Sequence, residues 1–184
     1  AAQRVLDVES LATPAVIASM ELLHNDKTFL VRVRTTDGAE GWSIPNAMRL
    51  IDAYPIFLNR VAPFCIGTEG GDWEDNLWEL YRYKSNYKYQ GLPYWVCVAA
   101  AETAVLDLLG KLAGKSIGDL LGGVQRREIA VYRASGTRGN RPEEEVEDLQ
   151  QLVAESGARA VKFRVGGRMS KNADSLPGRS ATLI

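Results

Sequence analysis

The chain has 184 residues, of which 46% are hydrophobic and 24% charged, and its formal net charge at pH 7 is −1. This is an ordinary globular composition, and it lacks the positive charge typical of nucleic-acid-binding proteins. No apolar run reaches the length of a membrane span. We therefore expect a cytoplasmic protein with neither a nucleic-acid nor a membrane partner.

Histidine and cysteine usage limits the chemistry. The single histidine, His24, argues against a histidine-based zinc site. The cysteines, Cys65 and Cys97, are far apart and lack CxxC spacing, so buried thiols are predicted rather than a disulfide or a metal site.

The first elements predicted along the chain are strands. Residues 16–23 are rich in branched and apolar side chains, and residues 28–36 alternate apolar and cationic ones. The dipeptide "DG" at 37–38 is a hairpin signal, and residues 39–43 return as a third strand. The pattern predicts a three-stranded antiparallel meander over residues 16–43.

Helices are predicted next. Residues 72–84 form an amphipathic pattern with Asp72 as its N-cap, and residues 95–114 are apolar nearly all round, which indicates a buried helix. The aromatic and basic stretch 83–95 between them is interpreted as a packed loop, in preference to a nucleic-acid stacking surface. After a short helical turn at 116–123, these elements complete an α+β domain.

Within the buried helix, Asp107 and Lys111 stand four residues apart with the acid first. This order favours an ion pair along one helix face, and we interpret the two residues as a structural pair rather than catalytic groups.

The pattern changes after Gly123. Residues 128–136 predict a buried strand, 141–157 a helix and 160–167 a second strand, which together form a βαβ unit with parallel strands. Since a parallel sheet needs layers on both faces, this second architecture begins but does not finish in the chain. We expect two domains, residues 1–123 and 124–184.

The second strand carries two cations. In "AVKFRVGG", Lys162 and Arg164 lie two residues apart and so point to the same face, with Phe163 on the other. Packing alone does not require two adjacent cations, so this pair is a candidate functional feature.

Three segments together resemble the enolase superfamily, in the mandelate racemase and muconate lactonizing enzyme group. They are "AAAETAVLDLLGKLAGKSIGDLLGG", "VYRASG" and "AVKFRVG", and the hairpin "VRVRTTDGAEGW" also looks like that group's capping domain. The resemblance implies an α+β capping domain followed by the first βαβ of a TIM-like (β/α) barrel, incomplete in this chain. It also implies a homo-oligomeric enzyme that removes the proton alpha to the carboxylate of a small molecule, with Mg²⁺ stabilising the enolate.

By this resemblance, Lys162 and Arg164 are catalytic and lie at the end of the second barrel strand. The family commonly has a second lysine where this chain has Arg164. Guanidinium is a poor base but suits bidentate carboxylate binding. Three alternatives stay open: Lys162 acts as base or cation while Arg164 binds substrate, the base lies on other strands, or neither cation has a chemical role.

The resemblance also implies that specificity comes from two capping-domain segments, residues 24–27 and 43–49, with one hydroxyl from the first barrel strand. The candidate substrate-binding residues are Trp42, Asn46, Arg49 and Ser135.

The family's magnesium ligands follow later barrel strands, so none is expected in this chain and they lie beyond residue 184. The leading prediction is a sugar-acid dehydratase, because a single base suffices for dehydration whereas a racemase usually needs one on each face. The alternatives are a racemase, epimerase or cycloisomerase of the same superfamily, or a non-catalytic assembly module. We expect the 184 residues alone to be inactive.

Overall fold

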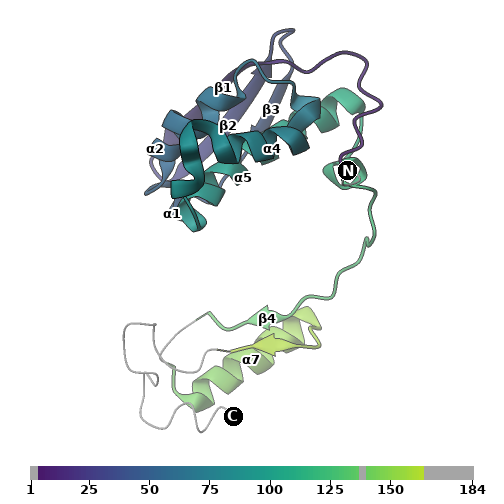
Figure 1. Ribbon diagram of the computed structural model, residues 1–184. Helices are drawn as coiled ribbons and strands as arrows, with labels where there is room; N and C mark the ends of the chain where they lie inside the picture. The colour runs from purple at the N-terminus through teal and green to yellow at the C-terminus, as the bar shows by residue number, and fades with distance from the viewer. Residues whose placement is uncertain (1–3, 137–139, 164–184) are drawn as a thin grey trace. The chain divides into compact units, whose positions relative to one another are not determined.

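The computed structural model describes residues 4–136 and 140–163, without the side chains of residues 85–87. The chain divides into two compact units, Ala1–Gln125 and Arg126–Ile184, which are described separately below (Figure 1).

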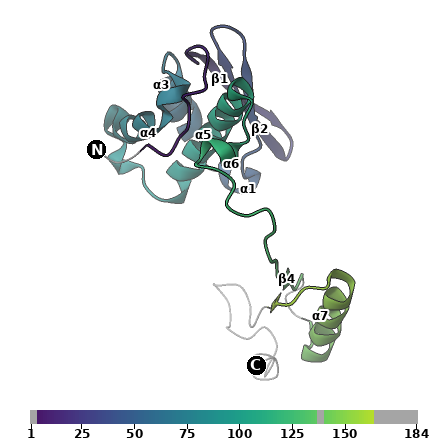
Figure 2. The same cartoon turned by 90° about the vertical axis from the view of Figure 1, so that its right-hand side faces the viewer.

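The sheet of the first unit is the predicted antiparallel meander. Its strands are β1 (Ile17–Asn25), β2 (Thr28–Thr35) and β3 (Glu40–Ser43), in the order β1-β2-β3. Alternation along β2 buries Phe29, Val31 and Val33 against the helices, whereas Arg32 and Arg34 lie on the other face. Figure 2 shows the helices gathered on one side of this sheet.

Two helices dominate the helical layer, the buried α5 (Leu92–Ala113) and the amphipathic α4 (Trp73–Arg82). The shorter helical elements of this unit are α1 (Ala47–Leu50), α2 (Tyr54–Ile56), η1 (Phe57–Val61), α3 (Ala62–Cys65), η2 (Gly70–Asp72), η3 (Tyr83–Lys88) and α6 (Ile117–Leu120).

The boundaries of two predicted elements were wrong. Helix α5 begins at Leu92, three residues before the predicted start. Pro93 is tolerated there because the backbone N–H groups in the first turn of a helix have no intrahelical partner, so the missing N–H of proline costs nothing. Residues Tyr83–Lys88 form a 3₁₀ helix rather than a loop. Asp72 occupies the N-cap position of α4, but its side chain makes no capping bond and instead pairs with Arg4.

The contact between β3 and α5 is unusually close. A Cβ atom on Gly41 would lie 2.6 Å from the N and Cβ atoms of Leu108, and closer still to the carbonyl oxygen of Ala104. Beside it, the Ser43 hydroxyl donates a hydrogen bond of 2.6 Å to the Ala100 carbonyl. Glycine at position 41 therefore lets the strand lie directly on the helix backbone.

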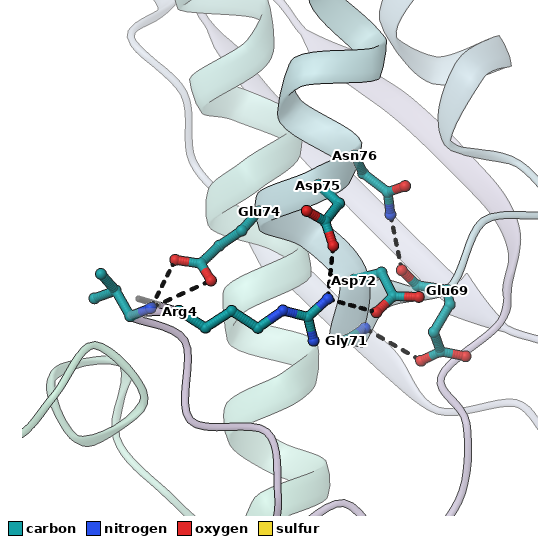
Figure 3. Close-up of polar contacts among 8 residues, drawn as sticks. Arg4, Glu69, Gly71, Asp72, Glu74, Asp75 and Asn76 are labelled. Carbon is teal, nitrogen blue, oxygen red and sulfur yellow. Dashed lines mark hydrogen bonds and ion pairs between the residues drawn. The ribbon is translucent and has the colours of Figure 1, made fainter. Parts of the chain in front are cut away.

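An N-terminal segment crosses the start of α4 (Figure 3). The Arg4 guanidinium contacts the carboxylates of Asp72 and Asp75 at 3.2 and 2.6 Å, and the Val5 backbone N–H donates to Glu74 at 2.9 Å. The carboxylates also lie near the positive end of the helix dipole. These contacts hold the N-terminal segment against the start of α4.

The same segment is fastened at a second place. The Asp7 carboxylate lies 2.7 Å from the Lys115 ammonium, and the Asp7 backbone N–H donates to the Leu120 carbonyl at 2.8 Å. The hydrogen bond from Lys115 lowers the pKa of the Asp7 carboxyl. Between these contacts Leu6 is buried, so the segment is part of the core.

Both cysteines are free and buried, as predicted. Burial raises the pKa of the Cys65 thiol to about 12 and that of Cys97 to about 11. Neither sulfur is therefore a thiolate at neutral pH, and both act as apolar core groups.

The second unit contains a strand, a helix and a parallel strand. They are β4 (Arg133–Ala134), α7 (Pro142–Ser156) and β5 (Val161–Lys162), with Ala134 opposite Lys162. The prediction of a buried first strand was wrong: β4 has two residues, and Ile129 and Val131 just before it are 76% and 70% exposed. Within the described part of the second unit, α7 covers only one face of the strand pair.

Replacing Gly41 by alanine is expected to destabilise the first unit by about 3 kcal/mol, because the new methyl group overlaps the backbone of α5. Urea denaturation of the variant measures this loss. Gly71→Ala is the matched control, since its Cβ would meet no atom closer than 3.4 Å. Equal stability of the two variants would contradict the close contact.

Replacing Asp7 by asparagine is expected to lower stability at neutral pH and to have a smaller effect in acid. The folded-state pKa of Asp7 lies below its unfolded value, so the stabilisation is complete above about pH 4 and is lost as the pH falls through the folded pKa. Denaturation midpoints at pH 7 and pH 3 test this, with Glu9→Gln as the control. A difference between wild type and variant that is as large at pH 3 as at pH 7 argues against the ion pair.

Candidate functional site

The two capping-domain segments expected to meet a substrate lie at the same end of the sheet. Asn25 pairs with Thr28 across the β1–β2 turn, and Val31 of β2 pairs with Ser43 at the end of β3. Antiparallel order therefore brings residues 24–27 and 43–49 to one edge.

Trp42 does not point toward the helices at this edge. Ser43 is buried against α5, so the preceding side chain lies on the opposite face of the sheet. There the Arg32 guanidinium lies 5.4 Å from the Trp42 ring and also pairs with Glu21 at 2.6 Å. The Trp42 backbone N–H donates to Asp107 at 2.8 Å, so this residue has clear structural contacts.

Asn46 and Arg49 share the turn that begins α1. The Asn46 side chain accepts a hydrogen bond of 3.2 Å from the Arg49 backbone N–H and so caps the helix. The Arg49 side chain is exposed, as are Ile44 and Met48, which are 77% and 74% exposed. This turn thus presents one cation and two apolar side chains.

His24 begins the other segment. Its ring stacks on Phe29, with centroids 4.2 Å apart, and both rings line a hollow of about 330 Å³. Tyr54 and Ile51 line the same hollow. The sheet edge is therefore apolar and aromatic around a single imidazole.

In the second unit, Lys162 lies on the face of the strand pair away from α7. Val161 lines a groove with Val146 and Val153 of α7, so the next side chain points to the opposite face. The Lys162 side chain is exposed there, and its Nζ lies 5.8 Å from the centroid of the Tyr132 ring. Tyr132 could not be found from the sequence, because its place beside Lys162 depends on the strand register, which pairs Ala134 with Lys162.

Ser135 is next to Lys162 in the sheet but does not share its face. The Ser135 backbone N–H donates to the Lys162 carbonyl at 2.9 Å, and this bond is part of the parallel ladder. Its side chain is buried on the α7 side, in a hollow of about 300 Å³ also lined by Glu145 and Asp148. The hydroxyl predicted to face substrate therefore lies on the helix side of β4.

Arg164 lies outside the described residues, so its predicted role stays a prediction. Among residues 4–136 and 140–163, no group of three or more histidine, cysteine or acidic side chains could hold a metal ion. The Asp107–Lys111 pair forms as predicted, at 2.6 Å, and binds the backbone of β3.

Another hollow, of about 740 Å³, lies between α4 and the start of α5. It is lined by Trp78, Tyr81 and Trp95, and its one acid, Glu74, already accepts the Val5 N–H. This hollow offers no convergent reactive groups. No helix in the described part of the chain is long and apolar enough to cross a bilayer.

The described residues thus combine a meander packed on a buried central helix with a parallel strand pair that presents an outward lysine. Residues 2–122 match the family described as mandelate racemase / muconate lactonizing enzyme, N-terminal domain. The chain therefore belongs to this family, and the resemblance found in the sequence is confirmed.

Curated relatives include two named sugar-acid dehydratases. The chain is 27% identical to the D-galactonate dehydratase of Verminephrobacter eiseniae over 67% of its own length and 31% of that protein. It is 32% identical to the D-mannonate dehydratase of a Sphingomonas species, over 67% of this chain and 27% of the relative. The chain thus spans less than a third of the length of these relatives.

Solved structures support the same fold. A candidate racemase from Roseobacter denitrificans is 31% identical with a TM-score of 0.79, over 91% of this chain and 45% of that one. A mandelate racemase/muconate lactonizing protein from Paracoccus denitrificans, complexed with magnesium, is 26% identical with a TM-score of 0.67, over 86% and 43% of the two chains.

Replacing Asn46 by alanine is expected to destabilise the first unit by about 1 kcal/mol, because the α1 backbone loses its cap. Asn46→Asp retains an acceptor and is expected to keep near-normal stability. Thermal denaturation distinguishes the two, and an alanine variant as stable as the aspartate variant would show that the cap contributes nothing.

Proposed function

We propose that residues 1–123 are the capping domain, and 124–184 the start of the (β/α) barrel, of an enolase-superfamily enzyme. Family membership supports the first part. The parallel β4–β5 pair with α7 on one face supports the second, since this is the repeating unit of such a barrel. The exposed Ile129 and Val131 are then side chains that further barrel elements would cover.

The proposed reaction begins with removal of the proton alpha to a carboxylate. The observation that carries this proposal is Lys162, whose side chain leaves the strand pair on the face away from α7, the interior face in a barrel. Loss of an alpha proton from a carboxylate creates a dianion, and a fixed ammonium stabilises that charge where it develops. Lys162 can serve as this cation or as the base.

Arg164 is proposed to bind the substrate carboxylate through its planar guanidinium fork. Its very high pKa in solution makes proton removal unsuitable. With one base at most on this strand, dehydration of a sugar acid is the favoured reaction, because a β-hydroxyl leaves and no second base is needed. The names of the curated relatives support the same choice.

Magnesium is proposed for the whole enzyme, as in the magnesium complex of the Paracoccus relative. The described residues of this chain do not form a metal site, so no magnesium ligand is assigned among them. As the family resemblance implies, the magnesium ligands are proposed to lie on later barrel strands.

At the capping-domain edge, the turn with Asn46 and Arg49 is proposed to contact the substrate, with His24 at the same end of the sheet. Trp42 and Ser135 stay weaker candidates, because their side chains lie on the far face of the sheet and on the α7 side. Racemase, epimerase or cycloisomerase activity is the second candidate function, favoured by the racemase neighbour.

In the whole enzyme, Lys162→Ala is expected to abolish turnover of a sugar-acid panel assayed with Mg²⁺ while leaving the circular dichroism spectrum unchanged. Lys111→Ala is the matched control, since that ammonium pairs with Asp107 in the first unit and is expected to leave turnover nearly intact. Near-normal activity of the Lys162 variant would overturn its role. Equilibration of the alpha stereocentre without loss of water would favour the racemase alternative.

A further inference from the structure

One face of the β4–β5 pair carries Tyr132, Ala134 and Lys162, and we call it the open face. Ala134 lies opposite Lys162 in the parallel register, so these two side chains share a face. Tyr132 precedes Ala134 by two residues and returns to that face. All three residues are exposed in the described structure.

The ring of Tyr132 is the described partner of the lysine. Lys162 Nζ lies 5.8 Å from the ring centroid, within the range of a cation–π interaction. Within residues 4–136 and 140–163, no carboxylate pairs with Lys162, whereas Lys111 and Lys115 each have an acidic partner. Lys162 is thus held differently from these structural lysines.

The difference has a chemical consequence. A carboxylate beside Lys162 would orient the ammonium but would also cancel its charge toward an anionic substrate. An aromatic face attracts the ammonium through its quadrupole and carries no net charge. The four-carbon lysine stem is flexible, so a contact that restricts it reduces the ordering cost when substrate binds.

We propose that Tyr132 is a positioning residue whose ring holds the Lys162 ammonium on the open face without neutralising it. The catalytic meaning of this contact rests on the proposed function, but the contact itself can be measured in the chain as it stands. Tyr132 is 55% exposed, so replacing it removes little packing among the described residues.

The experiment compares Tyr132→Phe, which keeps an aromatic face, with Tyr132→Leu, which removes it. Lysine side chains labelled with ¹³C at Cε are followed by NMR, and Lys162→Arg assigns the Lys162 signal. Wild type and the Phe variant are expected to show an upfield ring-current shift of the Lys162 Hε protons, and the Leu variant is expected to lose it.

The Lys111 signal is the internal control and is expected to be the same in all three proteins. Identical Lys162 Hε chemical shifts in the Phe and Leu variants would overturn the proposal. In the whole enzyme, kcat is expected to fall in the Leu variant and to be retained in the Phe variant. If the NMR contrast is present but no sugar acid is turned over, the proposed reaction fails while the Tyr132 contact stands. If turnover is present without the contrast, only the Tyr132 proposal fails.

Discussion

The first unit depends on how closely β3 can approach α5. Gly41 removes the one Cβ that would separate the strand from the backbone at Ala104 and Leu108. Polar contacts then hold the two elements on either side, from Ser43 to the Ala100 carbonyl and from the Trp42 N–H to Asp107. Because β3 is only four residues long, it forms a short hydrogen-bond ladder with β2, and these contacts with α5 hold it in place.

The second unit is organised by strand alternation. The α7 side receives Val161 and Ser135, which are apolar or buried, and the open face receives Lys162 and Tyr132. Successive residues along a strand therefore alternate between the face that packs on α7 and the face that carries Lys162. The same β5 strand therefore attaches a helix with one side chain and presents a cation with the next.

Much of the fold could be predicted from periodicity. The alternation of β2, the apolar α5 and the helix α7 each depend on local sequence, and all three elements formed, although α5 begins three residues before its predicted start. Contacts across the chain could not be predicted this way. The i,i+4 spacing gave the Asp107–Lys111 pair, but the bond from Asp107 to the Trp42 backbone joins residues 65 apart. The face of the strand pair on which the Ser135 side chain lies could not be predicted either, because the register of a two-residue strand depends on tertiary packing.

The capping-domain edge illustrates how a stable scaffold can serve a binding role. Ser43 is tied to α5 before the turn, and Asn46 caps α1 within it, so the chain between them is fixed at both ends. Ile44 and Met48 project from this short, anchored turn and are largely exposed. In a buried loop such apolar side chains would pack in the core. In this turn the polar contacts anchor the backbone and the apolar side chains stay exposed. Side chains on rigid supports lose little freedom on binding, which is consistent with the substrate contact that we propose for this turn.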